Sequence, residues 1–442
     1  MARNGLVRDL VLTGAVTLAY ANGLRGEFQF DDYTVIVHNA GIRDLSAWAA
    51  SMPGIRPLLK LSYALNWSSG LGTAGFHAVN LVCHIAAALL AMRLCGRLAT
   101  ASERLAPLAG PIALTAGLIF ALHPAQTEAV TYISGRSMSL MGALYLGAVA
   151  LHVGGGNRLL SLAFFALALA TKETAVTLPA ALVLVDGAVG VPWGRAWRRS
   201  IPHWTMLGAA LAAGLALPGY RRLLTFSVSI RPIGENLLTQ IDGIWYLLTQ
   251  PLLLLRANID PPLSPCMAPT LVLAIQGCLL LALVVLGIVL LRRWPPLGAA
   301  VLWFFLHLAP TNSLFPRLDV ANDRQLYLAI LGPAFLLAAG LWSWLPRRAA
   351  VAAATGLALV LLTATVLRNG DYRTEVTLWT ATVAASPENA RAWSNLGYAY
   401  QLAGEPTRAR DAYLRALGLD PGAFRAYWNL QTLPDAAAST PP

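Results

Sequence analysis

Residues 270–291 read TLVLAIQGCLLLALVVLGIVLL, without one charged side chain, and are followed directly by Arg292 and Arg293. A helix needs about 20 mostly apolar residues to cross the hydrocarbon core of a membrane. Arginines in short loops favour the cytoplasmic side of that membrane. We therefore expect residues 270–291 to form a transmembrane helix that ends at the cytoplasmic face.

Apolar runs of the same kind recur along the 442 residues. The chain is 57% hydrophobic and only 12% charged, whereas a soluble domain carries about 25% charged residues. The sequence therefore predicts an all-α, polytopic membrane protein, with about eleven transmembrane helices in a domain of residues 1–367. The expected spans are 6–24, 77–95, 108–124, 138–153, 159–172, 174–190, 201–219, 270–291, 297–312, 325–345 and 349–367.

The first of these runs allows two interpretations. Ala19-Tyr20-Ala21, after Arg3 and Arg8, resembles the cleavage site of a secretory signal peptide. We favour an uncleaved first helix, because the rest of the chain is itself multi-spanning.

The charged loops predict a single orientation, with the N-terminus in the cytoplasm. The net charge of +11 then comes from cytoplasmic loops, and we expect no nucleic-acid partner, because no basic stripe is interleaved with aromatic residues. The arginines on the cytoplasmic side are Arg93, Arg97, Arg104, Arg158, Arg195, Arg198, Arg199, Arg292, Arg293, Arg347 and Arg348. The carboxylates on the external side are Asp31, Asp32, Glu128, Glu173, Asp260, Asp319 and Asp323.

One apolar stretch, residues 237–255, is interrupted by Asp242 and Pro251. Counting it as a span would reverse every later loop and spoil the arginine bias. We expect it to be an interfacial or re-entrant segment within the external loop 220–269.

The composition changes after residue 367. Residues 393–400, WSNLGYAY, fit the W-x-x-L-G-x-x-Y signature of a tetratricopeptide repeat. A 34-residue period relates Pro387 to Pro421 and Trp393 to Tyr427. We expect tetratricopeptide repeats over 368–433, on the external side, followed by a flexible tail at 434–442 that is rich in Ala, Ser, Thr and Pro.

Ionisable residues cluster on the external side, where such groups at membrane depth are functional candidates. Asp31 and Asp32 lie in the external loop 25–76, and a carboxylate there suits a general base toward a hydroxyl, although a solvated loop or a helix cap is the alternative. Pro124 should break its helix and bring His123, Glu128 and Arg136 to one external lip.

Two further clusters suit an anion. Lys172 and Glu173 occupy a very short external turn, where they form either an internal ion pair or, through Lys172, a contact to a lipid phosphate. Asp323 and Arg324 open a later span, and the planar guanidinium of Arg324 suits phosphate. His77, Asn80 and His84 share a helix face, and we favour interhelical hydrogen bonds over a metal site for them.

Familiar nucleotide and zinc motifs are missing from the sequence. It contains neither a Walker A motif nor H-E-x-x-H, and no G-x-G-x-x-G that follows a strand. The four cysteines form no C-x-x-C pair. With no soluble nucleotide-binding domain, we expect an activated substrate to arrive through the membrane on a lipid carrier.

These blocks, in this order, resemble the transmembrane and tetratricopeptide-repeat O-mannosyltransferases and their bacterial relatives. The likeness covers nearly the whole chain. The matching stretches are Phe30-Asp31-Asp32 with Asn39, Arg56-Pro57-Leu58 with Asn66, Phe76-His77-Ala78-Val79-Asn80 with His84, Leu122-His123-Pro124 through Thr127-Glu128-Ala129-Val130 to Gly135-Arg136, Lys172-Glu173, and Asp323-Arg324-Gln325-Leu326-Tyr327.

The resemblance implies a C-type glycosyltransferase fold and an inverting transfer. The sugar would pass from a polyprenyl-phosphate donor to a hydroxyl of a protein or glycan acceptor docked by the repeats, on the periplasmic face of a bacterial inner membrane. Asp31 or Asp32 would be the base. Arg324, Lys172 and His123 would bind the donor phosphate. Residues that would orient the site are Glu128, Arg136, Glu173, Asp323, Arg56, His77 and Asn80.

No cofactor is required by this scheme, although paired carboxylates could hold a divalent metal. The chain departs from the family at Asp323, where many relatives should have Glu, which leaves the sugar and the acceptor open. Two rival readings remain: a transporter of lipid-linked glycans, and a non-enzymatic scaffold that presents the repeats to a secretion or pilus assembly. The scaffold leaves the ionisable clusters unexplained, and a transporter predicts polar groups through the membrane midplane.

Overall fold

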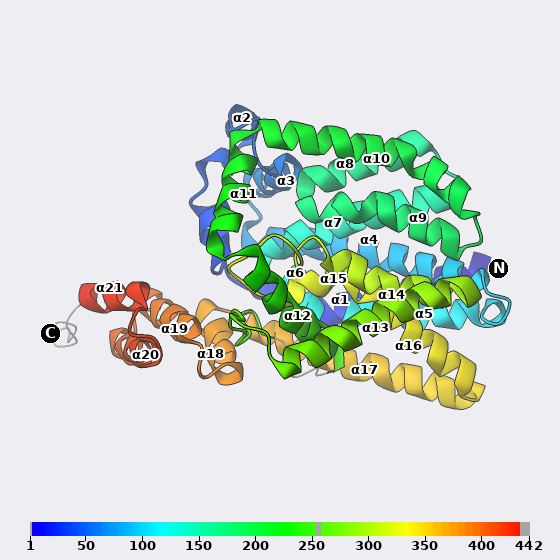
Figure 1. Cartoon of the computed structure of the whole chain (residues 1–442). Helices are drawn as coiled ribbons and strands as arrows, with labels where there is room; N and C mark the ends of the chain where they lie inside the picture. The colour runs from blue at the N-terminus through cyan, green and yellow to red at the C-terminus, as the bar shows by residue number, and fades with distance from the viewer. Residues whose placement is uncertain (1, 253–257, 434–442) are drawn as a thin grey trace.

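The computed structural model describes residues 2–252 and 258–433, and every regular element among them is a helix (Figure 1). This confirms the all-α prediction. The helices of the N-terminal part are α1 (Ala2–Tyr20), α2 (Leu45–Ala50), α3 (Pro57–Ser68), α4 (Gly72–Thr100), α5 (Ala109–Leu122), α6 (Thr127–Val130), α7 (Arg136–Val153), α8 (Arg158–Thr171), α9 (Leu178–Ala188), α10 (Trp193–Ala216), α11 (Pro218–Ile230), α12 (Ile233–Thr249), α13 (Leu271–Arg293), α14 (Pro295–Leu308), α15 (Leu326–Ala329), α16 (Leu331–Trp344) and α17 (Arg347–Asp371).

The centre of the bundle is α4, which packs against α5 and α7. Alanine and leucine dominate its sequence, and both favour helix. Ala87, Ala88 and Ala91 are completely buried on the face that meets its neighbours. Small residues at such an interface let helix backbones approach closely, which is how membrane helices gain packing contacts.

Three helices, α4, α13 and α17, are long and apolar enough to cross a membrane on their own. Three more candidate spans are bent pairs: 106–122 with 124–130 (52°), α10 with α11 (86°), and 323–329 with 331–344 (57°). The apolar helices α8 and α14 are shorter, at 14 residues each. The described residues thus support a helical membrane protein, but they do not confirm the count of eleven spans.

Two of the expected spans are interrupted at polar or proline residues. The expected span 174–190 is a 3₁₀ turn, η7 (Glu173–Thr177), followed by the short helix α9. The expected span 201–219 breaks before Pro218. Within the expected interfacial segment 237–255, α12 ends at Thr249 and a 3₁₀ turn, η8 (Gln250–Leu252), follows; residues 253–255 lie outside the described residues, and the interfacial placement stays a prediction.

Two of the breaks lie side by side. After α5, His123 is extended (ψ 131°) before Pro124, and the 3₁₀ turn η5 (Pro124–Gln126) leads into α6. Asn322 is likewise extended before the 3₁₀ turn η9 (Asp323–Gln325) and α15. A residue before proline avoids the helical region, so the break at His123 can be predicted from the sequence. Because η9 packs against α6, irregular backbone from both spans meets at one level of the bundle.

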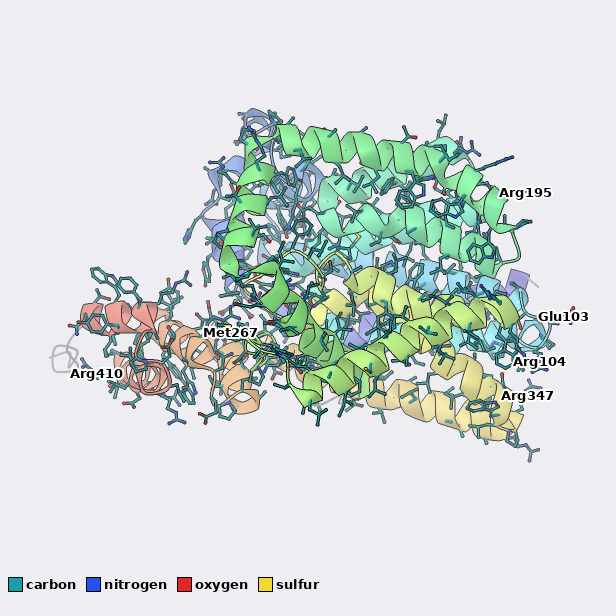
Figure 2. All side chains as sticks on the ribbon, in the orientation of Figure 1. Glu103, Arg104, Arg195, Met267, Arg347 and Arg410 are labelled. Carbon is teal, nitrogen blue, oxygen red and sulfur yellow. The ribbon has the colours of Figure 1, made fainter. Side chains whose placement is uncertain are left out.

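The arginines assigned to the cytoplasm and the repeats lie at opposite ends of the molecule. Figure 2 shows Arg104, Arg195 and Arg347 at the end away from the repeats, where the N-terminus also lies, and Arg410 in the repeats. The predicted alternation of loops requires this segregation.

The repeat domain consists of α18 (Glu375–Ala385), α19 (Ala390–Leu402), α20 (Pro406–Leu419) and α21 (Phe424–Thr432), which project from the end of α17 (Figure 1). Gly397 is needed where α19 crosses α20, because a Cβ there would lie 2.5 Å from the Tyr413 ring. This is the close approach that the repeat signature predicts. The tail 434–442 lies outside the described residues.

Candidate functional site

Asp31 and Asp32 are neighbours in sequence but lie in different surroundings. Asp32 is fully buried; its carboxylate accepts the amide N–H of Gln29 (3.0 Å), the amide N–H of Ser134 (2.8 Å) and the Ser134 hydroxyl. Burial raises the pKa of Asp32 to about 7, although these hydrogen bonds act to lower it. Asp32 therefore ties the first external loop to the turn that precedes α7.

Asp31, by contrast, is half-buried. Its backbone N–H donates to the Tyr132 hydroxyl (2.9 Å), while its carboxylate has no hydrogen bond or ion pair among the described residues. Phe30, just before it, has a left-handed backbone (φ 46°), which costs energy in a residue other than glycine. The carboxylate lies within electrostatic range of Arg324.

Arg324 and Glu128 join the two broken spans. The backbone N–H of Arg324 donates to Glu128 Oε2 (3.0 Å), and its Nε lies 3.3 Å from Glu128 Oε1. Glu128 is 2% exposed, whereas the Arg324 side chain is 17% exposed. Asp319 Oδ2 lies 3.7 Å from Nη2 of the same guanidinium. Glu128 thus holds Arg324 in place and leaves part of the guanidinium accessible.

The exposed part of Arg324 lines a cavity of about 400 Å³, counting the portion open to solvent. One wall is cationic and another is apolar. The lining residues are Met138, Met141, Lys172, Thr174, His307, Thr311, Arg317, Arg324, Gln325 and Leu328.

Three cations line this cavity, and no carboxylate is among its lining residues. Lys172 donates only to the Ser137 hydroxyl (3.1 Å), and Arg317 has no ion pair among the described residues. Burial, together with the nearby guanidinium groups, holds the pKa of Lys172 well below its ordinary value. Burial and the charge of Arg324 lower the pKa of Arg317 to about 10. Such mutual repulsion is relieved when an anion binds between the cations.

Arg56 and Glu173 form a pair at the edge of this region. Arg56 Nε donates to Glu173 Oε1 (2.9 Å), and Nη2 donates to Oε2 (2.7 Å). Burial acts to raise the pKa of Glu173, but the charge of Arg56 outweighs it and the pKa falls below its ordinary value. The pair links the first external loop to η7, and so sets the position of Lys172 next to it.

Arg136, Asn80 and His77 form a buried scaffold rather than part of the cavity wall. Arg136 donates from Nε to Asn80 Oδ1 (2.7 Å), and Asn80 in turn donates to the carbonyl of Val130 (3.1 Å). His77 Nε2 contacts the carbonyl of Gly26 (3.1 Å). Together these side chains hold the backbone that carries Asp32 and Ser134. His77 and Asn80 are thus engaged in hydrogen bonds, as expected from the sequence.

His123 and Asp323 also lie away from the cavity. His123 accepts the Ala125 N–H at Nδ1 (3.1 Å) and contacts the Pro251 carbonyl at Nε2 (3.1 Å), so it caps the break after α5. Asp323 accepts from Gln250 Nε2 (3.2 Å) and from the backbone of Asn258 (3.1 Å). These contacts fasten Gln250, Pro251 and Asn258 to the bundle. Neither side chain is among the residues that line the cavity, and the assignment of His123 to the donor phosphate stays a prediction.

The repeats contact both sides of this site. Trp379 of α18 packs edge-on against Phe30, with ring centroids 5.2 Å apart. Arg391 of α19 binds Asp260 through Nε (2.8 Å) and also lies 2.9 Å from Asp319 Oδ1. Asp319 is therefore shared between Arg391 and the cavity arginine, Arg324.

Sequence reasoning missed Arg317, Thr174 and His307 as cavity residues, and it quoted Gln325 without a role. Arg317 could have been found, because it shares with Arg324 the unusual feature of an arginine in a short external loop. Nothing in the local sequence marks Thr174 or His307, which the tertiary packing of η7 and α14 brings together.

The paired-carboxylate metal site considered from the sequence does not form at Asp31 and Asp32, because the Asp32 oxygens are engaged by Gln29 and Ser134. Among residues 2–252 and 258–433, no three His, Cys, Asp or Glu side chains are grouped so that they could hold a metal ion. The arrangement that does form is an accessible carboxylate beside a cationic cavity with an apolar wall.

Bundle and repeats together define a helical membrane protein with a C-terminal tetratricopeptide-repeat domain, and a tetratricopeptide-repeat family profile matches residues 365–424. The chain is similar to a protein O-mannosyl-transferase of Caenorhabditis elegans, with 26% identity over 94% of this chain and 63% of the relative. It is 23% identical to protein O-mannosyl-transferase TMTC3 of Homo sapiens, over 97% of this chain and 53% of the relative. Protein O-mannosyl-transferase TMTC1 of Mus musculus is 35% identical over 31% of this chain and 16% of the relative.

These relatives and the repeat profile support the family resemblance that the sequence indicates. The chain spans roughly half to two thirds of the length of the relatives that match it end to end. No solved structure matches the chain significantly.

Proposed function

We propose that this protein is a membrane glycosyltransferase that moves a sugar, mannose or a related hexose, from a polyprenyl-phosphate donor to a hydroxyl of a protein. The names of its relatives support transfer of mannose to protein oxygen atoms. The observation that carries the proposal is the unpaired carboxylate of Asp31, within electrostatic range of an arginine in a cavity that has surplus positive charge.

The cavity supports a donor that is part anion and part lipid. Lys172, Arg317 and Arg324 suit the phosphate, because charge-assisted hydrogen bonds to guanidinium and ammonium groups are strong. Met138, Met141 and Leu328 suit the first units of the prenyl chain. A donor that arrives along the membrane also accounts for the absence of a nucleotide-binding motif.

The chemistry needs one base and one stabilised leaving group. The acceptor hydroxyl gives its proton to Asp31 while its oxygen bonds to the anomeric carbon. The bond from that carbon to the phosphate oxygen breaks, and polyprenyl phosphate leaves with its negative charge held by Arg324 and Lys172. A single displacement inverts the anomeric centre.

The acceptor would approach from the external face, which in a bacterial cell is the periplasmic face of the plasma membrane. The repeats stand directly beside Asp31, since Trp379 packs on the preceding Phe30. An extended segment of the acceptor protein held by the repeats would therefore present its hydroxyl to the carboxylate.

The test is Asp31→Asn in the full chain, with Glu388→Gln, a highly exposed repeat-domain carboxylate, as the matched control. We expect Asp31→Asn to lower transfer from polyprenyl-phosphate mannose by about 100- to 10,000-fold, as removal of a general base does, with unchanged thermal stability and donor binding. Full activity of Asp31→Asn would overturn the proposal and favour a scaffold.

A further inference from the structure

The donor cavity contains a second kind of group besides its cations. Thr174, His307 and Gln325 line it, and each has a buried polar atom without a hydrogen-bond partner in the protein: Thr174 Oγ1, His307 Nε2, and both amide atoms of Gln325. His307 is 8% exposed and Gln325 is 5% exposed. Buried polar groups are nearly always paired, so three unpaired ones along one cavity need a reason.

Comparable side chains nearby are paired. Thr311, which lines the same cavity, donates its hydroxyl to Asn312 Oδ1 (2.9 Å). Thr177, one turn after Thr174, is hydrogen-bonded to the Tyr145 hydroxyl (3.0 Å). Among the residues that line the cavity, the other one with such an atom is Arg324, whose Nε lies 3.3 Å from Glu128 Oε1. The three neutral side chains come from three separate elements: η7, α14 and η9.

The chemistry of these atoms excludes two parts of the donor. His307 Nδ1 contacts the carbonyl of Trp303 (2.9 Å), so Nδ1 carries the proton and Nε2 presents a lone pair. A lone pair repels a phosphate oxygen, and none of the three groups suits a prenyl chain. A hydroxyl can donate to His307 Nε2 and can both donate to and accept from the Gln325 amide and the Thr174 hydroxyl.

We propose that Thr174, His307 and Gln325 form the subsite for the sugar ring of the donor, and that they determine which hydroxylated sugar is accepted. This rests on the proposed function, because it places a sugar next to the phosphate held by Lys172, Arg317 and Arg324. Trp303 stacks on His307, with ring centroids 4.1 Å apart, and so fixes the direction of Nε2.

A subsite of this kind selects its sugar through the cost of leaving a buried polar group unpaired. A sugar that lacks the matching hydroxyl leaves a buried polar group unpaired, and sites built in this way reject such analogues strongly. Hexoses with the right hydroxyl arrangement are accepted, and deoxy sugars are refused.

The experiment measures the binding of two probes to the full chain in lipid nanodiscs: polyprenyl phosphate without sugar, and polyprenyl-phosphate mannose. The variants are Thr174→Val, Gln325→Leu and His307→Phe, and Thr177→Val is the matched control. We expect each variant to weaken the sugar-bearing probe about 3- to 10-fold, the value of one hydrogen bond, and to leave the sugar-free probe within about 2-fold. Thr177→Val should lower thermal stability without changing the ratio of the two affinities.

Four results would overturn the sugar subsite. If the wild-type protein binds both probes equally, or if the variants weaken both equally, the sugar subsite is wrong while the donor site stands. If the wild-type protein binds neither probe, the proposed function fails and the subsite fails with it. Thr174→Ser keeps the hydroxyl and should bind the sugar-bearing probe as the wild type does, so a loss there would also overturn the subsite.

Discussion

The donor cavity and the junction with the repeats both contain buried or half-buried arginine, yet the two regions differ in how carboxylates balance that charge. At the junction, Arg391 is shared by two carboxylates, Asp260 and Asp319. In the cavity, Lys172 and Arg317 have no carboxylate partner among the described residues, and Arg324 has Glu128 and a distant Asp319. A balanced cluster holds a protein together, whereas an unbalanced one is suited to a ligand that carries the missing charge.

The largest effect should come from removing the central cation of the cavity. We expect Arg324→Ala to lower kcat/KM for polyprenyl-phosphate mannose by about 100- to 1,000-fold, because a preorganised group that stabilises the departing charge is lost. Glu128 would then be a buried carboxylate without its cation, so Arg324→Ala/Glu128→Gln is the matched variant. Wild-type kinetics in that double variant would show that the cavity does not hold the leaving phosphate.

A second test uses the depressed pKa of Lys172. Its protonated form binds phosphate, and burial beside three guanidinium groups lowers its pKa well below the ordinary value of about 10.4. Affinity for polyprenyl phosphate should therefore fall as the pH rises through this lowered pKa, by about 10-fold in all. Lys172→Arg, whose charge persists, should abolish this step; a titration identical to that of the wild type would rule out Lys172 as its source.

A substitution in the balanced cluster at the junction with the repeats should change the stability of the protein rather than its activity. Arg391→Ala leaves Asp260, whose side chain is 7% exposed, without its partner. We expect a loss of about 1–2 kcal/mol in the free energy of unfolding, less than for a fully buried pair because Arg391 is itself half-exposed. Thermal unfolding measures it, and Asp260→Asn added to Arg391→Ala should restore part of the loss. If the two substitutions are simply additive, the ion pair is not what stabilises the junction.

The smallest expected effect is an increase in affinity for polyprenyl phosphate. Asp319 lies 3.7 Å from Arg324 and competes with a bound phosphate for its charge. Asp319→Asn should strengthen the binding of polyprenyl phosphate about 2- to 5-fold, the value of one partly exposed ion pair. Weaker binding would mean that Asp319 positions Arg324 rather than competing for it.

The sequence predicted the helical fold and the repeats well, because apolar runs and the 34-residue signature are local patterns. It could not count the spans, since Lys172, Pro124 and Pro218 divide apolar runs into pieces whose packing decides whether they cross a membrane. It also named Arg324, Glu128 and Lys172 together, from their charge and the side of the membrane.

The different surroundings of Asp31 and Asp32 could not be predicted from the sequence. They depend on the left-handed backbone of Phe30 and on Ser134, which lies about a hundred positions away in the chain. The resemblance implied a phosphate role for His123, and its contact with the carbonyl of Pro251 could not be predicted from the sequence. Tertiary hydrogen bonds of this sort leave no mark on the local sequence.

The contact between Phe30 and Trp379 has a consequence for how this protein can be dissected. An unfavourable backbone conformation persists only while its surroundings enforce it, and here part of that enforcement comes from the first helix of the repeats. The two halves are therefore not interchangeable modules. A truncation that removes only the repeats would still free the backbone at Phe30, next to Asp31. It would therefore lower the rate of transfer as well as weaken the binding of a protein partner.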